Sequence, residues 1–275
     1  MNIEFYKMSG AGNDFVVIDN RNGRIKNKVA LARKLCERHF GIGADGLMLI
    51  EKAKKADYTM SYFNADGSYG GMCGNGGRCI SFLAYTLGAA GKKQRFIAND
   101  RIYTSRILKN QVALTMVDPW DTSFNERLTI NDKVYPYHFI NTGAPHVVID
   151  VDEMVTKFHL LEDAPVEIIG AQIRYHQNFA PNGTNVNFIK RTATSQIFVR
   201  TYERGVEAET QACGTGSVAS ALIASTIWKI SSPITVIPKS GKKLTVKFKR
   251  ISDTEFSDIQ LIGPAVITFR GNIDI

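Results

Sequence analysis

The hydrophobic pattern of the chain predicts many short strands and a few helices. Apolar residues at helical spacing predict helices over Val29–Phe40, Gly74–Leu87 and Gly214–Trp228. The turn residues Lys109-Asn110 predict a hairpin between Ile102–Leu108 and Val112–Val117. Further strands are expected at Ile3–Met8, Phe15–Ile18, Tyr58–Phe63, Gln196–Tyr202, Ile234–Ile237, Leu244–Phe248, Ile259–Ile262 and Ala265–Phe269. Because strands pair locally and helices are few, the pattern indicates an α+β fold with mostly antiparallel sheets.

The two halves of the sequence repeat one another. Four features match in the same order: Ser9–Asp19 with Thr142–Asp150, Asp45–Ile50 with Thr184–Ile189, Tyr62 with Tyr202 (each 11 residues before a cysteine), and Cys73-Gly74-Asn75-Gly76 with Cys213-Gly214-Thr215-Gly216. Chance would rarely produce four matches in one order. The repeat therefore predicts two copies of one fold, packed about a pseudo-twofold axis.

A domain boundary is expected near Asp118-Pro119-Trp120, where proline and aspartate interrupt the pattern. The predicted N-terminal domain covers residues 1–117 and carries Cys73. The predicted C-terminal domain covers residues 118–261 and carries Cys213. The strands that flank Gly263-Pro264 are expected to return to the first domain, which adds residues 262–275 to it.

Composition narrows the class of protein. The chain has 275 residues, of which 44% are hydrophobic and 22% charged, so disordered and collagen-like classes are excluded. No apolar run approaches the roughly 20 residues that span a bilayer. The start, Met1–Phe5, lacks the layout of a signal peptide. We therefore expect a cytoplasmic protein with no membrane partner.

The net charge of +8 leaves two interpretations open. The basic residues could bind a nucleic acid or an anionic small substrate, or they could form a solvated surface. The basic residues are spread thinly, and no nucleic-acid-binding signature stands among them. The solvated surface is favoured, and no nucleic-acid partner is expected.

The four cysteines and five histidines show no metal-binding spacing, so no metal site is expected. Cys36 and Cys79 lie on apolar helical segments and are expected to be buried packing residues. No Walker A motif, complete dinucleotide fingerprint or zincin motif occurs. Gly41-Ile42-Gly43 is interpreted as a turn. The simplest hypothesis is a site without a cofactor.

Cys73 and Cys213 each precede a glycine-rich helix start. The first N–H groups of a helix lack backbone partners and carry partial positive charge, which favours an anion. A cysteine there is expected to have its pKa lowered from about 8.5 toward neutrality. The alternative is a tight turn that places a small buried residue before a helix. Two copies on a duplicated scaffold favour the functional interpretation.

One acid/base group from each half suits inversion at a carbon. A base removes a proton from one face and a conjugate acid returns one to the opposite face. The pair would start as one thiolate and one thiol. Carbanion character at the carbon would need stabilisation by the helix N–H groups.

Five motifs together resemble the diaminopimelate epimerase family. They are Met8–Phe15, Phe63–Ser68, Met72–Cys79, Tyr202–Gly205 and Gln211–Gly216. The resemblance implies a pyridoxal-independent epimerase that interconverts LL- and meso-diaminopimelate in lysine and peptidoglycan-precursor synthesis. It also implies two similar domains, each a barrel-like sheet around a central helix, and a homodimer.

The resemblance also implies roles for individual residues. Cys73 and Cys213 match the two acid/base thiols, and His146 and Glu203 match two supporting polar residues. Further positions match the substrate-binding residues of the family: Asn13, Asn64, Gly74, Asn75, Asn185, Glu203, Arg204, Gly214 and Thr215. Ala144 and Gly46 depart from residues common in the family. Two rival functions stay open, namely a proline-racemase relative and a non-catalytic ligand-binding protein on the same scaffold.

Overall fold

The computed structural model describes residues 1–154 and 161–274. The chain divides into two compact units. Unit 1 comprises Met1–Thr115 and Ile262–Ile275, and unit 2 comprises Met116–Leu261. No helix in the described part of the chain is long and apolar enough to cross a membrane.

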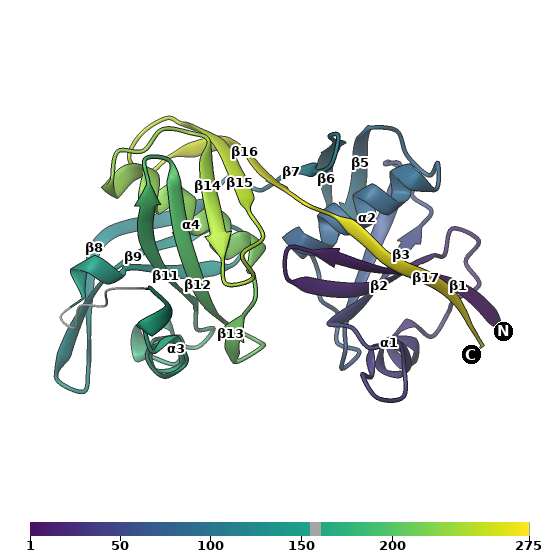
Figure 1. Cartoon of the computed structure of the whole chain (residues 1–275), viewed down its shortest axis with the longest axis horizontal. Helices are drawn as coiled ribbons and strands as arrows, with labels where there is room; N and C mark the ends of the chain where they lie inside the picture. Colours follow the sequence, from purple (N-terminus) through teal and green to yellow (C-terminus); the bar gives the residue numbers. More distant parts are fainter. Residues whose placement is uncertain (155–160, 275) are drawn as a thin grey trace. The chain divides into compact units, whose positions relative to one another are not determined.

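Unit 1 is a mostly antiparallel sheet wrapped around one helix (Figure 1). Its elements are β1 (Asn2–Gly10), β2 (Asn13–Asp19), α1 (Lys28–Cys36), β3 (Gly46–Glu51), β4 (Tyr58–Asn64), α2 (Gly74–Thr86), β5 (Lys93–Ala98), β6 (Arg101–Ile107), β7 (Val112–Thr115) and β17 (Val266–Asp274). Helix α2 packs against β1, β2, β3, β6, β7 and β17. A helix with buried residues on every side belongs at the centre of a fold.

Unit 2 has the same plan around α4 (Gly214–Ile227), whose residues are almost all buried. Its other elements are β8 (Trp120–Ile130), β9 (Lys133–Asn141), β10 (Pro145–Asp150), η1 (Val151–Glu153), η2 (Leu161–Asp163), α3 (Val166–Arg174), η3 (Gln177–Phe179), β11 (Asn185–Ala193), β12 (Gln196–Glu203), β13 (Ala208–Thr210), β14 (Ile234–Pro238), β15 (Leu244–Arg250) and most of β16 (Phe256–Gly263). Helix α4 packs against β9, β10, β11, β12, β14 and β15.

The order of strand pairings repeats between the units. In unit 1, β2 pairs parallel with β3, β3 antiparallel with β4, β4 parallel with β5 and β5 antiparallel with β6. In unit 2, the same alternation joins β10 to β11, β11 to β12, β12 to β14 and β14 to β15. The internal sequence repeat therefore corresponds to a repeat of topology.

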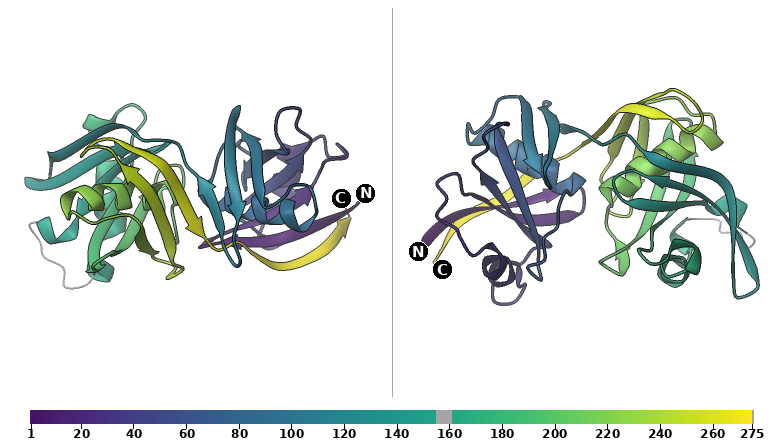
Figure 2. Two further views of the ribbon diagram at one scale, coloured as in Figure 1. Left: turned by 90° about the horizontal axis from the view of Figure 1, so that it is seen from above. Right: turned by 180° about the vertical axis from the view of Figure 1, so that it is seen from behind.

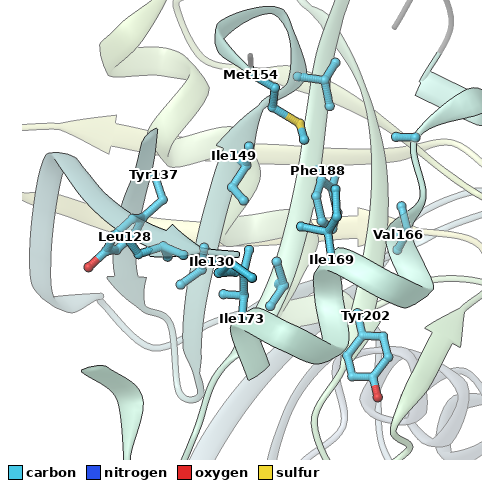
Figure 3. Close-up of a cluster of buried hydrophobic side chains, with 14 of the residues drawn as sticks. Leu128, Ile130, Tyr137, Ile149, Met154, Val166, Ile169, Ile173, Phe188 and Tyr202 are labelled. Atoms are coloured by element: carbon cyan, nitrogen blue, oxygen red, sulfur yellow. The ribbon is translucent and has the colours of Figure 1, made fainter. Parts of the chain in front are cut away.

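Each unit also packs a second helix against its sheet. In unit 1, α1 contributes Leu31 and Leu35 to a core with Val16 and Leu49. In unit 2, α3 packs on β11 and β12, and Ile169 lies beside Phe188 in a buried cluster that includes Ile173 (Figure 3). Each sheet is thus covered by apolar side chains on both faces, which holds the strand ends that carry the site residues.

The C-terminal strand belongs to unit 1. Strand β17 pairs antiparallel with β1, from Asn2 opposite Asp274 to Ser9 opposite Val266. Strand β17 lies along β1 near the N-terminus of the chain (Figure 2). The return of this segment was expected from the strands around Gly263-Pro264.

The structure confirms the α+β class and the strands and helices predicted from the pattern, with one helix end wrong. Helix α1 stops at Cys36, whereas the prediction ran to Phe40. Glu37 is extended, and the N–H groups of Ile42 and Gly43 both donate to Leu35 O, so the chain folds back over the helix end. The pattern also missed α3, the long hairpin of β8 and β9, and the strands β3, β5, β10, β11 and β13.

We expect Gly46→Ala to destabilise unit 1. A Cβ on Gly46 would lie 2.5 Å from Phe63 O and 2.5 Å from the Tyr62 ring. Overpacking of this kind costs about 1–3 kcal/mol, and each kcal/mol lowers the melting temperature of a protein of this size by about 2–4 °C.

Differential scanning calorimetry checks this prediction, with Gly91→Ala as the matched control. A Cβ on Gly91 meets nothing closer than Lys93 O at 3.9 Å. Equal melting temperatures for the two variants would contradict the prediction.

Candidate active site

The two cysteines of the repeated motif cap the two central helices in the same way. Cys73 precedes α2 with φ −113° and ψ 125°, and its sulfur accepts the Gly76 N–H at 3.4 Å. Cys213 precedes α4 with φ −106° and ψ 121°, and its sulfur accepts the Gly216 N–H at 3.3 Å. Each sulfur therefore lies at the positive end of a helix, where a thiolate is favoured.

The two caps differ in exposure. Cys73 is half-buried, whereas Cys213 is 6% exposed. The Thr215 hydroxyl lies 3.5 Å from the Cys213 sulfur. By contrast, Cys36 and Cys79 are buried, and burial raises the pKa of each to about 12. The expectation that these two thiols serve packing is confirmed.

In unit 1, a chain of amides lies beside the first turn of α2. Asn75 Nδ2 donates to Asn13 Oδ1 at 2.6 Å, and Asn13 Nδ2 donates to Asp45 Oδ2 at 3.1 Å. Arg78 donates to Asn75 Oδ1 at 2.7 Å, which fixes the direction of the chain. Both ends of the Asn75 side chain are therefore occupied within unit 1.

Asn64 begins the turn that follows β4. Its backbone N–H donates to Ser68 O at 2.9 Å, and its side-chain amide donates to Ser68 Oγ at 2.9 Å. The adjacent Ala65 N–H donates to Asp45 O at 3.1 Å. This turn is thereby joined to the residue that holds Asn13, so both asparagines belong to one part of unit 1.

In unit 2, His146 is fully buried beside Asn187. The Thr201 hydroxyl donates to Asn187 Oδ1 at 2.9 Å, so the NH₂ end of the amide faces His146 Nδ1 at 3.1 Å. Nδ1 therefore accepts, and the proton of the neutral ring sits on Nε2. Nε2 is buried without a hydrogen-bond partner in the described part of the chain. Burial, with a smaller contribution from the Arg204 charge, lowers the pKa of His146 to about 3.

The other predicted residues of unit 2 lie at neighbouring strand ends. Asn185 donates to Pro145 O at 2.9 Å and accepts the Arg204 N–H at 2.9 Å. The Glu203 carboxylate accepts the Thr210 hydroxyl at 2.9 Å. Arg204 Nη1 donates to Asn182 O at 3.1 Å from a half-exposed side chain. Asn185 thus ties the start of β11 to the Glu203-Arg204 pair.

No role was predicted for several residues that hold the site. Arg78 is the one charged residue in the sequence of α2, and Asn187 is a polar residue in the buried part of β11. Asp45 directly precedes an apolar strand. A lone polar residue inside an apolar element is the signal that could have identified Arg78 and Asn187. The described residues contain no cluster of three acidic, histidine or cysteine side chains that could hold a metal ion.

We expect the buried, neutral His146 to make the protein less stable in acid. The pKa of His146 is about 3 in the folded state and about 6.5 when unfolded, so the unfolded state binds more protons between these values. The contribution of the neutral His146 ring to the free energy of unfolding is therefore complete above pH 6.5 and is lost as the pH falls below that value. Between pH 7 and pH 5 the loss is about 2 kcal/mol.

Urea unfolding of the protein and of His146→Gln at both pH values measures this difference. His138, whose pKa burial lowers to about 4, is present in both proteins, so its contribution cancels. An identical pH dependence in both proteins would show that His146 titrates normally.

Sequence comparison places the chain in a family. The diaminopimelate epimerase family model matches residues 5–99 and 138–260. The chain belongs to the diaminopimelate epimerase family. It is 43% identical to the diaminopimelate epimerase of Chlorobaculum tepidum over 98% of this chain and 100% of that protein. It is 40% identical to that of Flavobacterium psychrophilum, again over 98% and 100%. The family assignment inferred from the motifs is confirmed, and the chain is an amino-acid epimerase.

Solved structures show the same fold at low sequence identity. A probable proline racemase from Agrobacterium radiobacter superposes with a TM-score of 0.75 at 13% identity, covering 99% of this chain and 93% of that one. A phenazine biosynthesis protein of the PhzF family from Bacillus anthracis gives 0.73 at 15% identity, covering 100% of both chains. At this identity the likeness supports the fold alone.

Proposed function

We propose that this chain interconverts LL- and meso-diaminopimelate without a cofactor, with Cys73 and Cys213 as the two acid/base groups. The observation that carries the proposal is the matched pair of helix-capping cysteines in a member of this family. The proposal treats the two units as two domains of one enzyme, each of which contributes one thiol.

The proposed reaction is a proton exchange at one carbon. The thiolate of one cysteine takes the α-proton, the C–H electron pair stays on the carbon and delocalises into the carboxylate, and an S–H bond forms. The second thiol then gives its proton to the opposite face and becomes the thiolate. Protons and charge balance, and the reverse reaction exchanges the two roles.

The reacting carboxylate needs anion stabilisation while the carbanion forms. The proposal assigns this role to the N–H groups of Gly74, Asn75, Gly214 and Thr215, which begin the two helices. These groups stand at the positive ends of the two helix dipoles, where an anion is favoured. Because such donors are fixed by the fold, they need no reorganisation when charge develops.

The far end of the substrate carries a second carboxylate and a second ammonium group. We assign the carboxylate to Arg204, because a guanidinium can donate two parallel hydrogen bonds to it. We assign hydrogen bonds with the polar groups of the substrate to Asn13, Asn64 and Asn185. Glu203 is assigned as the carboxylate that pairs with the ammonium group. Glu203 and His146 are further proposed to support the catalytic thiols, with His146 acting as a neutral ring.

Deuterium wash-in tests the function. The protein is incubated in deuterated water with LL-diaminopimelate, and the α-hydrogen signal is followed by NMR together with the appearance of the meso isomer. We expect the signal to disappear as inverted product forms. Proline is the comparison substrate, and heat-denatured protein is the blank. Exchange with proline alone would favour a proline-racemase function, and binding without exchange would favour a ligand-binding protein.

The family resemblance also supports a homodimer that works in the cytoplasm. Light scattering of the purified chain at several concentrations tests the first proposal, and a dimer mass that persists on dilution is the expected result. Fractionation of the producing cells tests the second.

A further inference from the structure

Arg78 is a fully buried cation at the start of the central helix of unit 1. It is 0% exposed, and all its hydrogen bonds go to uncharged acceptors. It donates to Gly74 O at 3.2 Å, Gly10 O at 3.2 Å, Pro264 O at 3.4 Å and Asn75 Oδ1 at 2.7 Å. No carboxylate pairs with it within residues 1–154 and 161–274. A buried charge without a counter-ion is costly, so the fold retains it at a cost in stability.

Two titratable groups raise the pKa of Arg78 by their charge, Cys79 and, to a smaller extent, Cys73. Burial lowers the pKa of Arg78 to about 10, which leaves the guanidinium charged at neutral pH. Burial raises the pKa of Cys79 to about 12, so Cys79 stays protonated. Cys73, which is half-buried, is therefore the one of the two that can supply the missing negative charge.

The strands around α2 supply no competing partner. Their charged or titratable side chains are Glu4, Tyr6 and Lys7 of β1, Asp14 and Asp19 of β2, Glu51 of β3, Arg101, Tyr103 and Arg106 of β6, and Arg270 and Asp274 of β17. The acidic groups nearest the core have cations of their own. Lys7 pairs with Asp14 at 2.6 Å, Arg21 with Asp19 at 2.6 Å, and Lys28 with Glu51 at 2.5 Å.

Unit 2 lacks the buried cation at the matching place. Arg78 stands five residues after Cys73, and the residue five after Cys213 is Val218, within a helix that has no charged residue. A second difference lies opposite the motif glycines. A Cβ on Gly76 would meet Met48 Sδ, whereas one on Gly216 would meet Asn187 Oδ1. Met48 and Asn187 occupy equivalent positions, opposite Val17 and Val148 on the preceding strands.

The groups around α4 add no equivalent charge. The titratable or charged side chains on its neighbouring strands are Lys133, Tyr135, Tyr137 and His138 of β9, His146 and Asp150 of β10, Lys190 and Arg191 of β11, Arg200, Tyr202 and Glu203 of β12, and Lys247, Lys249 and Arg250 of β15. Both histidines are held neutral by burial, and Arg200 pairs with Glu209 at 2.6 Å. Arg204 is half-exposed, so solvent screens its charge more than that of Arg78.

We propose that Arg78 holds Cys73 as the thiolate in the substrate-free protein, in which Cys213 is then the thiol. The inference rests on the proposed function, since it assigns protonation states to the two thiols of that reaction. Arg78 acts on the thiol through its charge and does not touch the substrate, so it is a positioning residue. The duplicated helices are thereby made unequal in charge.

The test measures thiol ionisation directly. The protein is alkylated with iodoacetamide for short times from pH 5 to pH 10, and modification of each cysteine is followed by peptide mass spectrometry. We expect Cys73 to react at lower pH than Cys213. Arg78→Met should lower the rate of Cys73 at neutral pH about tenfold and leave Cys213 unchanged. Arg78→Lys should recover part of the Cys73 rate.

Arg21→Met is the matched control, because it removes the same charge from a half-buried ion pair in the same unit. A Cys73 profile that changes equally in Arg21→Met and Arg78→Met would overturn the proposal. So would an unchanged profile in Arg78→Met accompanied by a raised KM, because Arg78 would then serve only to orient Asn75 and Asn13.

A second measurement covers the case in which Arg78→Met does not fold. Cysteine labelled with ¹³C at Cβ is titrated by NMR in the unmodified protein, and Cys73 must ionise at lower pH than Cys213. The reverse order would overturn the proposal. Neither the alkylation nor the NMR titration requires turnover. If Cys73 is ionised but the protein fails to exchange deuterium, the proposed function is refuted, whereas the effect of Arg78 on the ionisation of Cys73 is not.

Discussion

Cys73→Ala and Cys213→Ala are each expected to lower the rate of epimerisation by at least about 10³-fold. Positioned acid/base groups contribute about 10²–10⁴-fold, and in a two-base reaction the loss of either thiol stops net inversion. Each cysteine contributes one capping hydrogen bond to its helix, so replacement by alanine should cost about 1 kcal/mol and leave the unit folded. Stereochemical assay of the product, with circular dichroism of each variant, measures both effects.

Cys36→Ala is the matched control for these variants. It removes a buried thiol of unit 1 that the reaction does not use, and it should keep the activity within a factor of about two at a small cost in stability. Retention of more than a tenth of the original rate in either Cys73→Ala or Cys213→Ala would refute the two-base scheme.

Arg204→Met is expected to reduce kcat/KM for diaminopimelate by about 100-fold, mainly through KM. A hydrogen bond to a charged group contributes about 1.5–3 kcal/mol, and each 1.4 kcal/mol is tenfold. The side chain donates to a single backbone carbonyl within the described residues, which leaves further guanidinium donors for a ligand. Steady-state kinetics with both isomers measures this loss. The kcat/KM of Arg204→Lys should fall between that of the unmodified protein and that of Arg204→Met.

Arg191→Met provides the comparison for Arg204→Met. Arg191 is an exposed arginine of β11 whose side chain donates to Ala193 O and Thr194 O in the same hairpin. Arg191→Met changes the net charge by the same amount as Arg204→Met. Equal losses of kcat/KM in the two variants would therefore mean that the loss is a long-range effect of charge and that Arg204 does not bind substrate.

Most of the fold could be predicted because the sequence pattern is local. Alternating strands and short turns are visible within a few residues of one another, and the internal repeat is visible when the two halves of the sequence are compared. The end of α1 was missed because Gly41 approaches the carbonyl of Lys34, a contact that apolar spacing does not express. Helix α3 was missed because Ile168 is exposed while Ile169 and Ile173 are buried, which blurs the apolar stripe.

The site was predictable where a motif repeats and unpredictable where partners are distant. The two Cys-Gly-x-Gly segments identify both capping cysteines from sequence alone. The acceptor of Arg78 at Pro264 lies 186 residues away, so no local pattern identifies this hydrogen-bond partner. The same holds for His146 and Asn187, which are 41 residues apart and meet only because β10 and β11 are paired.

The pairing of β17 with β1 bears on the synthesis of the chain. Unit 1 receives β17 from residues that leave the ribosome only after all of unit 2 has emerged. Until then β1 presents an unpaired edge to solvent along the side that β17 will occupy, and unpaired edges invite association with other chains. Nascent chains halted before Val266 should therefore hold a finished second unit beside a first one that is open to aggregation and to proteases.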